Sequence, residues 1–560
     1  MKRILAIFMV LVMLFSFAAC TGSGNDGDTV RNEYEFTTGY DETKYNAPGE
    51  FPVFKEKQTI SVMMPDQLYV EDWETNAQTA RMEEELNAEL VMTVLPSKEY
   101  STKINLMAAA GGEEFKDAIL SSNGGSFSDG MVINLADAGV IVPITEYAYN
   151  KDIAPNMYEA IERIGWNYYP YMTMPDGEIY YVPQLNDSIL ANNSKMFVYK
   201  PWFEAAGVDT DEIHTTEDFK EALLKVVKND PNGNGKADEV GISSYASSKK
   251  WIHYLMNAFV YAGGSNYMYV KDGELGFAFL RDEWKEGLKY INELYDLGLI
   301  DPLAFSQDSA GFKSMVNYED TIVAAWAMTD ATRIAEDDPR RVEYLAIPPL
   351  NSSWNNGKPL SSHTPAKPMA GILIAANATN PEAAFRFGDY MASEDVSIHS
   401  RYGVKGTDWL EPREGDKAMY DSLGYEPYLV EVLQWGEVQN SHWFQTGPYI
   451  RQKATTAGAV WNGIPNVVKT GADGQLLYEG SNPEEEIVKL IYTEEEDEIV
   501  TEAIANIKTY AEQMTAKFII GELDIDKEWD AYVQQIESMN ASGVLECAQA
   551  AYDRMQAIAE

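Results

Sequence analysis

A run of oxygen-bearing side chains between residues 230 and 239 has the spacing of a calcium-binding loop. Oxygen donors stand at alternate positions, and Gly235 occupies the sixth place, where such a loop turns sharply. The twelfth place, usually a bidentate glutamate, holds Gly241, so Glu239 must close the ligand shell. The expected ligands are Asp230, Asn232, Asn234, Lys236 through its backbone carbonyl, Asp238 and Glu239.

The pattern predicts a structural calcium ion rather than a catalytic one. Protein oxygens would fill the coordination sphere and leave little room for an activated water or a substrate. The alternative is a polar turn without metal, because Asp, Asn and Gly favour turns in any case.

The rest of the chain shows no catalytic signature. It contains no Gly-x-Ser-x-Gly elbow, no His-Glu-x-x-His and no pair of Cys-x-x-Cys motifs. The 5 histidines are dispersed, and 88 acidic residues offer too many carboxylate pairs to rank. An enzyme is therefore not indicated, although a carboxylate pair in a cleft would favour one.

The first twenty residues read as an export signal. Lys2 and Arg3 precede an apolar run from 4 to 17, and Ala18-Ala19-Cys20 forms a small-residue cleavage site. Phe17 to Cys20 resembles the lipobox of bacterial lipoproteins, with Phe in place of the usual Leu, which predicts lipidation of Cys20. The alternative is an ordinary signal peptide with a chance cysteine. A polar stretch, TGSGNDGD, follows as a flexible tether.

The composition excludes several classes of partner. A formal charge of -45 over 560 residues disfavours nucleic acid and binding to a membrane through a basic face. Hydrophobic residues make up 45% of the chain, which is enough for a globular body of two to four domains or lobes. The other cysteine, Cys547, has no partner if Cys20 carries lipid, so no disulfide is expected.

Alternating segments predict an α/β architecture. Short β-rich runs at 59–64, 90–95 and 117–120 are separated by helical patterns at 73–88 and 101–111. This order is typical of a parallel sheet flanked by helices. Ligands of such sheets bind beyond the carboxyl ends of the strands, which makes Asn123 a candidate contact.

Several motifs resemble those of a known family. They are YKPWFEAAG at 199–207, NPEAA at 380–384 followed by YGVKG at 402–406, and the C-terminal segments KFIIG, WDAYV and AAYDR at 517–521, 529–533 and 550–554. Lys405 stands where glutamate is common. Together they resemble extracellular solute-binding protein family 1, the LplA/LipO-like carbohydrate-binding lipoproteins of ABC importers.

The resemblance implies a two-lobe periplasmic-binding-protein-like fold, in which each lobe has a mainly parallel sheet flanked by helices and a hinge joins the lobes. It also implies a monomer that closes on an oligosaccharide, delivers it to permease subunits, and is held by lipid at the outer face of a Gram-positive type cell membrane. The expected segments are signal peptide 1–19, tether 20–55, first lobe 56–190 and 365–430, and second lobe 191–364 and 431–560.

An oligosaccharide site needs flat aromatic platforms and hydrogen-bonding groups. Aromatic residues make up 12% of the chain, a surplus that sugar stacking would use. The candidates at strand or helix ends or in loops are Trp326, Trp443, Trp251 and Trp73. For each of them, packing in the core is an equally good interpretation.

Two further hypotheses remain at this stage. One is a lipid-anchored, calcium-containing enzyme that degrades polysaccharides, and the other is a surface scaffold with a vestigial cleft. The acidic charge favours a neutral or weakly charged oligosaccharide over a polyanion, unless a basic patch lines the cleft.

Overall fold

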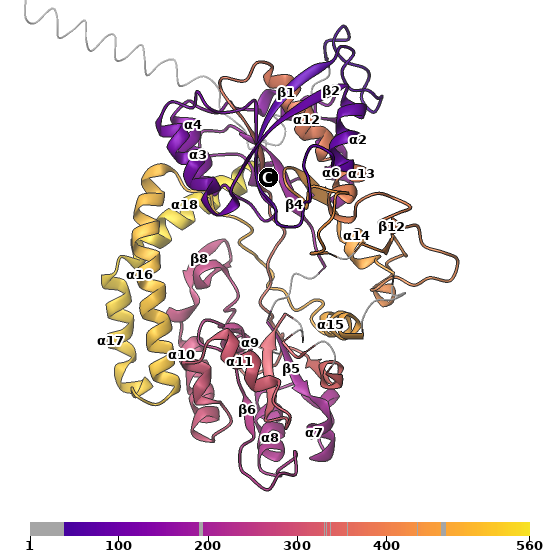
Figure 1. The fold of residues 1–560 in the computed structure, drawn as a ribbon. Coiled ribbons are helices and arrows are strands. Elements are labelled where there is room, and N and C mark those ends of the chain that lie inside the picture. The colour runs from indigo at the N-terminus through magenta and orange to yellow at the C-terminus, as the bar shows by residue number, and fades with distance from the viewer. Residues whose placement is uncertain are drawn as a thin grey trace, which may run out of the picture.

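The structure is a computed structural model that describes residues 39–559, except 190–193, 330, 332, 336–337, 356, 434 and 461–465. Two lobes lie one above the other, and long C-terminal helices run along one side of the molecule (Figure 1). Each lobe has its own sheet and its own hydrophobic core. The predicted two-lobe α/β class is confirmed.

The first lobe is built on a six-stranded sheet with the order β14-β4-β11-β3-β1-β2. Its strands run parallel except β11, which is antiparallel to both neighbours. Val62, Met63 and Met64 of β1 are all buried, as expected for a sheet covered on both faces. The strands are β1 (Gln58–Pro65), β2 (Ala88–Leu95), β3 (Ala118–Leu120), β4 (Tyr181–Asn186), β11 (Met369–Ile374) and β14 (Tyr449–Arg451).

Polar side chains cap several of the helices packed around this sheet. Ser128 accepts a hydrogen bond from the Met131 amide, and Asn380 accepts one from the Ala383 amide, so each satisfies a free N–H of a first turn. The helices are α2 (Ala77–Leu86), α3 (Tyr100–Ala109), α4 (Asp129–Asp137), α5 (Thr145–Ala148), α6 (Pro155–Ile164), α12 (Pro381–Met391) and α13 (Glu394–Tyr402).

The second lobe has a four-stranded sheet with the order β10-β5-β9-β6. Strand β5 is antiparallel to both neighbours, while β6 and β9 are parallel, so this sheet is mixed rather than mainly parallel. A hairpin of β7 and β8 lies beside it. The strands are β5 (Lys195–Tyr199), β6 (Val240–Ile242), β7 (Met268–Lys271), β8 (Glu274–Phe277), β9 (Val323–Met328) and β10 (Tyr344–Ile347). The helices are α7 (Lys200–Ala205), α8 (Thr216–Val227), α9 (Lys250–Met256), α10 (Asp282–Asp296) and α11 (Ser309–Val316).

Three C-terminal helices extend the core of the second lobe. The acidic stretch before them ends in a capping box, in which Thr493 and Glu496 bond each other's backbone amides and start the first helix. Tyr532 is buried, and its hydroxyl donates to the carbonyl of Phe279 at 3.2 Å. These helices are α16 (Glu494–Ile519), α17 (Ile525–Ser538) and α18 (Ala541–Ala559).

The predicted boundary of the second lobe at residue 431 is wrong. Strand β14 pairs with β4 of the first sheet, and Trp443 belongs to the first core. The chain returns to the second lobe only later, where the Tyr478 hydroxyl donates to the carbonyl of Ile347 in β10. Strands β12 (Trp409–Leu410) and β13 (Val430–Glu431) come before β14, and helices α14 (Lys453–Ala457) and α15 (Asn466–Leu476) come between β14 and this return.

A buried lysine ties the segment before α16 to the first lobe. The side chain of Lys489 is 6% exposed and lies 2.7 Å from a carboxylate oxygen of Asp129 in α4. It also donates to the Tyr181 hydroxyl at 3.0 Å and to the carbonyl of Pro368 at 3.2 Å. The last crossing between the lobes is therefore anchored firmly at its first-lobe end.

The predicted tether 20–55 is wrong at its C-terminal end, because Tyr45 and Phe54 are buried in the core of the first lobe. The other N-terminal expectations lie outside the part of the chain that the structure describes. Cys20 and the leader fall before residue 39. Within the described ranges, no helix combines the length and apolar character that a membrane span requires.

Candidate functional site

In the described part of the chain, four segments cross between the lobes and pair into two ribbons. The first ribbon joins 184–188 to 449–453 through the β4–β14 pairing, and the Asp187 amide continues it by donating to the Arg451 carbonyl at 3.0 Å. The second ribbon joins 361–368 to 481–489, where the Ser361 amide donates to the Ser481 carbonyl at 2.8 Å. The two ribbons form the connection on which the lobes can hinge.

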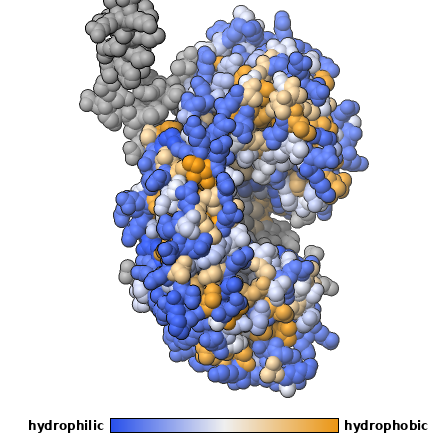
Figure 2. All heavy atoms as spheres, turned by 90° about the vertical axis from the view of Figure 1, so that its left-hand side faces the viewer, coloured by the Kyte–Doolittle hydropathy of each residue, from blue (hydrophilic) through white to orange (hydrophobic). Residues whose placement is uncertain are grey.

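A cavity of about 540 Å³ lies against both ribbons and the end of α6. Figure 2 shows the hollow that separates the upper and lower lobes on one side of the molecule. The aromatic residues that line the cavity are Trp166, Tyr171 and Tyr425, and the hydrogen-bonding residues include Arg163, Asp187, His363, Gln452 and Lys453. This mixture is what an oligosaccharide site requires.

The aromatic wall depends on how α6 ends. Gly165 adopts a left-handed conformation with φ 83°, which terminates the helix and turns the chain back on itself. Trp166 follows directly, and its ring meets the ring of Tyr171 edge to face, with centroids 5.8 Å apart and an interplanar angle of 78°. Two half-buried rings at nearly a right angle form a corner that can hold the apolar face of a sugar.

The polar wall comes from the first ribbon. The Asp187 side chain is 12% exposed, and its carboxylate lies 3.7 Å from the Lys453 ammonium. Burial raises the pKa of Asp187, and Lys453 opposes that shift. Arg163 donates to the carbonyl of Ile450 at 3.0 Å, and Gln452 donates to Glu394 at 2.7 Å. Asp187 keeps acceptor capacity for ligand hydroxyls.

The predicted tryptophan platforms are wrong as ligand contacts in this conformation. Trp326 and Trp443 are 0% exposed, Trp251 is 1% exposed and Trp73 is 9% exposed. Trp326 packs on Tyr344 with ring centroids 3.8 Å apart, deep in the second lobe. The physical reason is that β9 is buried along its whole length, so a ring on it has no route to solvent.

Asn123 lies where the sheet argument predicts. It is exposed just beyond β3 at the carboxyl edge of the first sheet, and its side-chain oxygen accepts a hydrogen bond from the Tyr449 hydroxyl at 3.3 Å. Its role as a ligand contact stays a prediction.

The aromatic residues that line the cavity were not among the predicted contacts. The signal was present as a cluster of rings directly after a helix-ending glycine, in the segment 166–171 (WNYYPY). Tyr168 and Tyr169 of this cluster are buried in the core, whereas Trp166 and Tyr171 are half-buried and line the cavity.

The predicted calcium loop places its donors together in the second lobe. Side-chain oxygens of Asp230, Asn232 and Asn234 all accept backbone amides from inside the loop, at 2.8 to 3.1 Å. The amide groups of Asn232 and Asn234 in turn donate to the carboxylate of Asp238, at 3.2 to 3.3 Å. Hydrogen bonds to these side-chain oxygens therefore hold the loop in a compact conformation.

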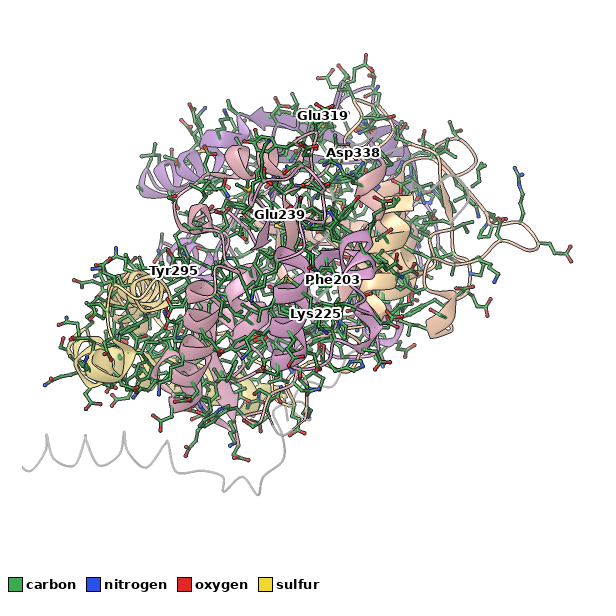
Figure 3. The ribbon with its side chains drawn as sticks, turned by 90° about the horizontal axis from the view of Figure 1, so that it is seen from below. Phe203, Lys225, Glu239, Tyr295, Glu319 and Asp338 are labelled. Carbon is green, nitrogen blue, oxygen red and sulfur yellow. The ribbon has the colours of Figure 1, made fainter. Side chains whose placement is uncertain are left out.

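Glu239 completes this loop and lies just before β6; Figure 3 labels it in the view from below. It is 8% exposed, and its Oε1 is buried without a hydrogen-bond partner. Burial raises the pKa of Glu239, and the nearby Asp230 and Asp238 add to that shift. Across the described ranges, no group of three or more His, Cys, Asp or Glu side chains converges as a metal site, because amides stand between these carboxylates. The residues fit calcium through mixed carboxylate, amide and carbonyl oxygens.

The segment between β13 and β14 contains a strained corner. Phe444 and Gln445 are consecutive left-handed residues, with φ of 52° and 57°. His442 holds this corner, because its Nδ1 accepts the amide of Phe444 at 3.0 Å. The Phe444 ring stacks on Trp435 with centroids 3.8 Å apart.

Comparison with known proteins identifies the family. The family model for bacterial extracellular solute-binding proteins matches residues 69–398. The chain belongs to this family.

Two curated relatives span nearly the whole chain. One is a fructooligosaccharide ABC transporter substrate-binding protein, FusA, of Streptococcus pneumoniae, 26% identical over 90% of this chain and 92% of its own. The other is lipoprotein LipO of Bacillus subtilis, 25% identical over 88% of this chain and 91% of its own.

Solved structures show the same fold. A solute-binding protein of Bifidobacterium longum infantis, described as binding HMO, has a TM-score of 0.72 at 17% identity and covers 89% of this chain and 99% of its own. FusA, solved as an EF-hand mutant with fructo-nystose, has a TM-score of 0.64 at 22% identity over 89% of this chain and 99% of its own.

The strained corner gives a pH dependence with a defined sign. Burial lowers the pKa of His442 to about 3, and Arg401 adds to that shift. A histidine in the unfolded chain has a pKa of about 6.5. Between these two pKa values the unfolded state binds more protons than the folded state. The contribution of neutral His442 to the free energy of unfolding is therefore fully present above about pH 6.5 and is lost as the pH falls towards 3.

We expect the free energy of unfolding of the native chain, relative to His442→Gln, to fall by about 2 kcal/mol between about pH 7 and about pH 5. Denaturant titrations of both proteins at both pH values measure this difference. A difference that does not change with pH would contradict the neutral His442.

Proposed function

We propose that the chain is the substrate-binding component of a carbohydrate ABC importer, acting as a monomer that captures an oligosaccharide between its lobes. The observation that carries the proposal is the cavity of about 540 Å³ against the two ribbons, with an aromatic corner opposite a hydrogen-bonding wall. Its volume falls within the range of about 300 to 1,000 Å³ that small-molecule sites occupy.

The cavity favours a neutral or weakly charged sugar. Lys453 offsets Asp187. Burial lowers the pKa of Arg163 and the nearby Glu394 opposes that shift, so each of these two cations has a carboxylate close to it. Two of the relatives whose ligands are named, FusA and the HMO-binding protein, support oligosaccharides as the class.

The same wall argues for binding rather than hydrolysis. Glycoside hydrolysis by the usual mechanisms needs two carboxyl groups on either side of the scissile bond. Asp187 is the one carboxylate among the described residues that line the cavity. A captured sugar would therefore be passed on intact to permease subunits.

Replacing the aromatic corner tests the binding site. We expect at least one neutral oligosaccharide, from a panel that begins with kestose, to raise the melting temperature of the protein and to be recovered uncleaved. Trp166→Ala should weaken its binding in calorimetric titration by about tenfold, because one face of the stack is lost.

Trp354→Ala is the matched control, since Trp354 is 44% exposed and does not line the cavity. It should bind like the native chain. Cleaved sugar products, or equal affinities for the native chain and Trp166→Ala, would sink the proposal.

We infer that lipid on Cys20 attaches the protein to the outer face of the cell membrane. Support comes from the small-residue site at 18–20 and the polar tether that follows it. The acidic chain would not adhere to an anionic surface by charge, so a lipid must hold it there.

In cells fed a labelled fatty acid, the native chain should carry label in the membrane fraction. Cys20→Ser should carry none and should appear in the medium or retain its leader. A labelled Cys20→Ser protein would contradict the anchor.

We also propose that the loop 230–239 binds one structural calcium ion. The support is the buried Oε1 of Glu239, which has no hydrogen-bond partner, and whose carboxylate Asp230 and Asp238 make harder to ionise. A buried carboxylate without a partner needs a counter-charge. The ion would be held by Asp230, Asn232, Asn234, Asp238, Glu239 and the carbonyl of Lys236, with the two asparagine amides turned so that oxygen faces it. That FusA was solved as an EF-hand mutant is consistent with such a loop.

Calcium added to chelator-treated protein should raise its melting temperature by several degrees, because the ion binds only the folded loop. Glu239→Gln should lose most of this rise. Glu319→Gln, at an exposed carboxylate outside the donor set, should keep it. An identical melting temperature with and without calcium in the native chain would overturn the proposal.

A further inference from the structure

His363 lies at the centre of the second ribbon. Its Nδ1 is 2.5 Å from Oε1 of Glu486, which belongs to the other segment of that ribbon, and the two side chains are 14% and 22% exposed. The Tyr261 hydroxyl lies 3.4 Å from both the amide and the carbonyl of His363 and holds its backbone. The imidazole is therefore fixed in place while remaining open to solvent protons.

The same imidazole faces the first ribbon. His363 lines the cavity of about 540 Å³ together with Asp187, and it lines a second cavity of about 220 Å³ together with Glu486. Asp187 and His363 interact electrostatically across the larger cavity, and Asp187 is paired with Lys453 at 3.7 Å. Lys453, Asp187, His363 and Glu486 thus form a chain of charges, with one residue from each of the four crossing segments.

The charges around His363 make this chain sensitive to one proton. The ionisable groups that line the two cavities with His363 are Glu485, Glu486, Asp187, Lys367, Lys453, Arg163, Tyr171, Tyr261, Tyr269 and Tyr425. Lys453 is bound to Asp187, Arg163 is held by the carbonyl of Ile450, and Lys367 and Glu485 are exposed. The carboxylates of Asp187 and Glu486 remain the groups on either side of the ring.

When the His363 ring is neutral, the negative charges of Asp187 and Glu486 lie on different ribbons, and no positive charge lies between them. A protonated ring attracts both carboxylates, and signs along the chain then alternate from Lys453 to Glu486. Histidine changes its charge within the physiological range of pH, and charge-assisted hydrogen bonds are stronger than neutral ones.

We propose that His363 is a proton-operated latch between the two ribbons. Its protonation draws the first ribbon, through Asp187, towards the second ribbon, through Glu486, and favours a narrower separation of the lobes. The consequence for sugar capture, tighter binding in acid, rests on the proposed function. The lobe movement itself does not.

Spin labels on the two lobes measure the movement without any sugar. Leu106→Cys in α3 and Leu303→Cys in the second lobe are suitable sites because these side chains are 66% and 48% exposed. The labels are placed in the full chain with Cys20→Ser and Cys547→Ser. Double electron–electron resonance should show the ratio of short to long distances rising about three- to tenfold between about pH 8 and about pH 5.

His363→Gln should abolish this pH response, and Glu486→Gln should reduce it while leaving the imidazole in place. His214→Gln is the matched control, because His214 is exposed in the second lobe, away from the ribbons. It should respond like the native chain. The melting temperature of each variant shows whether it is folded.

A native distance distribution that is the same at both pH values, or a His363→Gln variant that still responds, would overturn the latch. Failure of every sugar to bind would contradict the proposed function and leave this result standing. The latch requires lobe movement that depends on pH, and a protein without such movement contradicts it.

Discussion

Two ribbons of paired chain connect the lobes, and the rest of the structure depends on where those ribbons are fixed. At the first-lobe end of the second ribbon, Lys489 is buried between Asp129, Tyr181 and the carbonyl of Pro368. A buried ammonium with three partners cannot be moved without a large loss of free energy. Bending between the lobes is therefore confined to the stretch of ribbon beyond this anchor, which also borders the larger cavity. Ligand contact and lobe movement share the same few residues.

The architecture follows from local sequence patterns to a large extent. The strands predicted at 59–64, 90–95 and 117–120 correspond to β1, β2 and β3, because continuous apolar runs bounded by turns are typical of covered parallel strands. Asn123 lies at the predicted sheet edge for the same reason. The lobe boundary at 431 could not be predicted, because β14 has three residues and joins the first sheet by pairing with a strand more than two hundred positions earlier.

The site was predictable only in part, and the failures have a common cause. Trp326 was a good candidate from its neighbours in sequence, but burial depends on what the rest of the fold places over a strand. Asp187, His363 and Lys453 come together only because three crossing segments meet, and nothing in their local sequence marks them. The calcium loop is the opposite case: its donors lie within ten consecutive residues, so their spacing alone brings them together, although the ion itself remains a proposal.

The central claim is that an oligosaccharide lies in the cavity against the two ribbons. A crystal structure of the protein grown with the sugar that most raises its melting temperature tests this claim directly. We expect sugar density in the corner formed by Trp166 and Tyr171, with ring hydroxyls within hydrogen-bonding distance of Asp187. Well-ordered sugar elsewhere, with this corner empty, would contradict it.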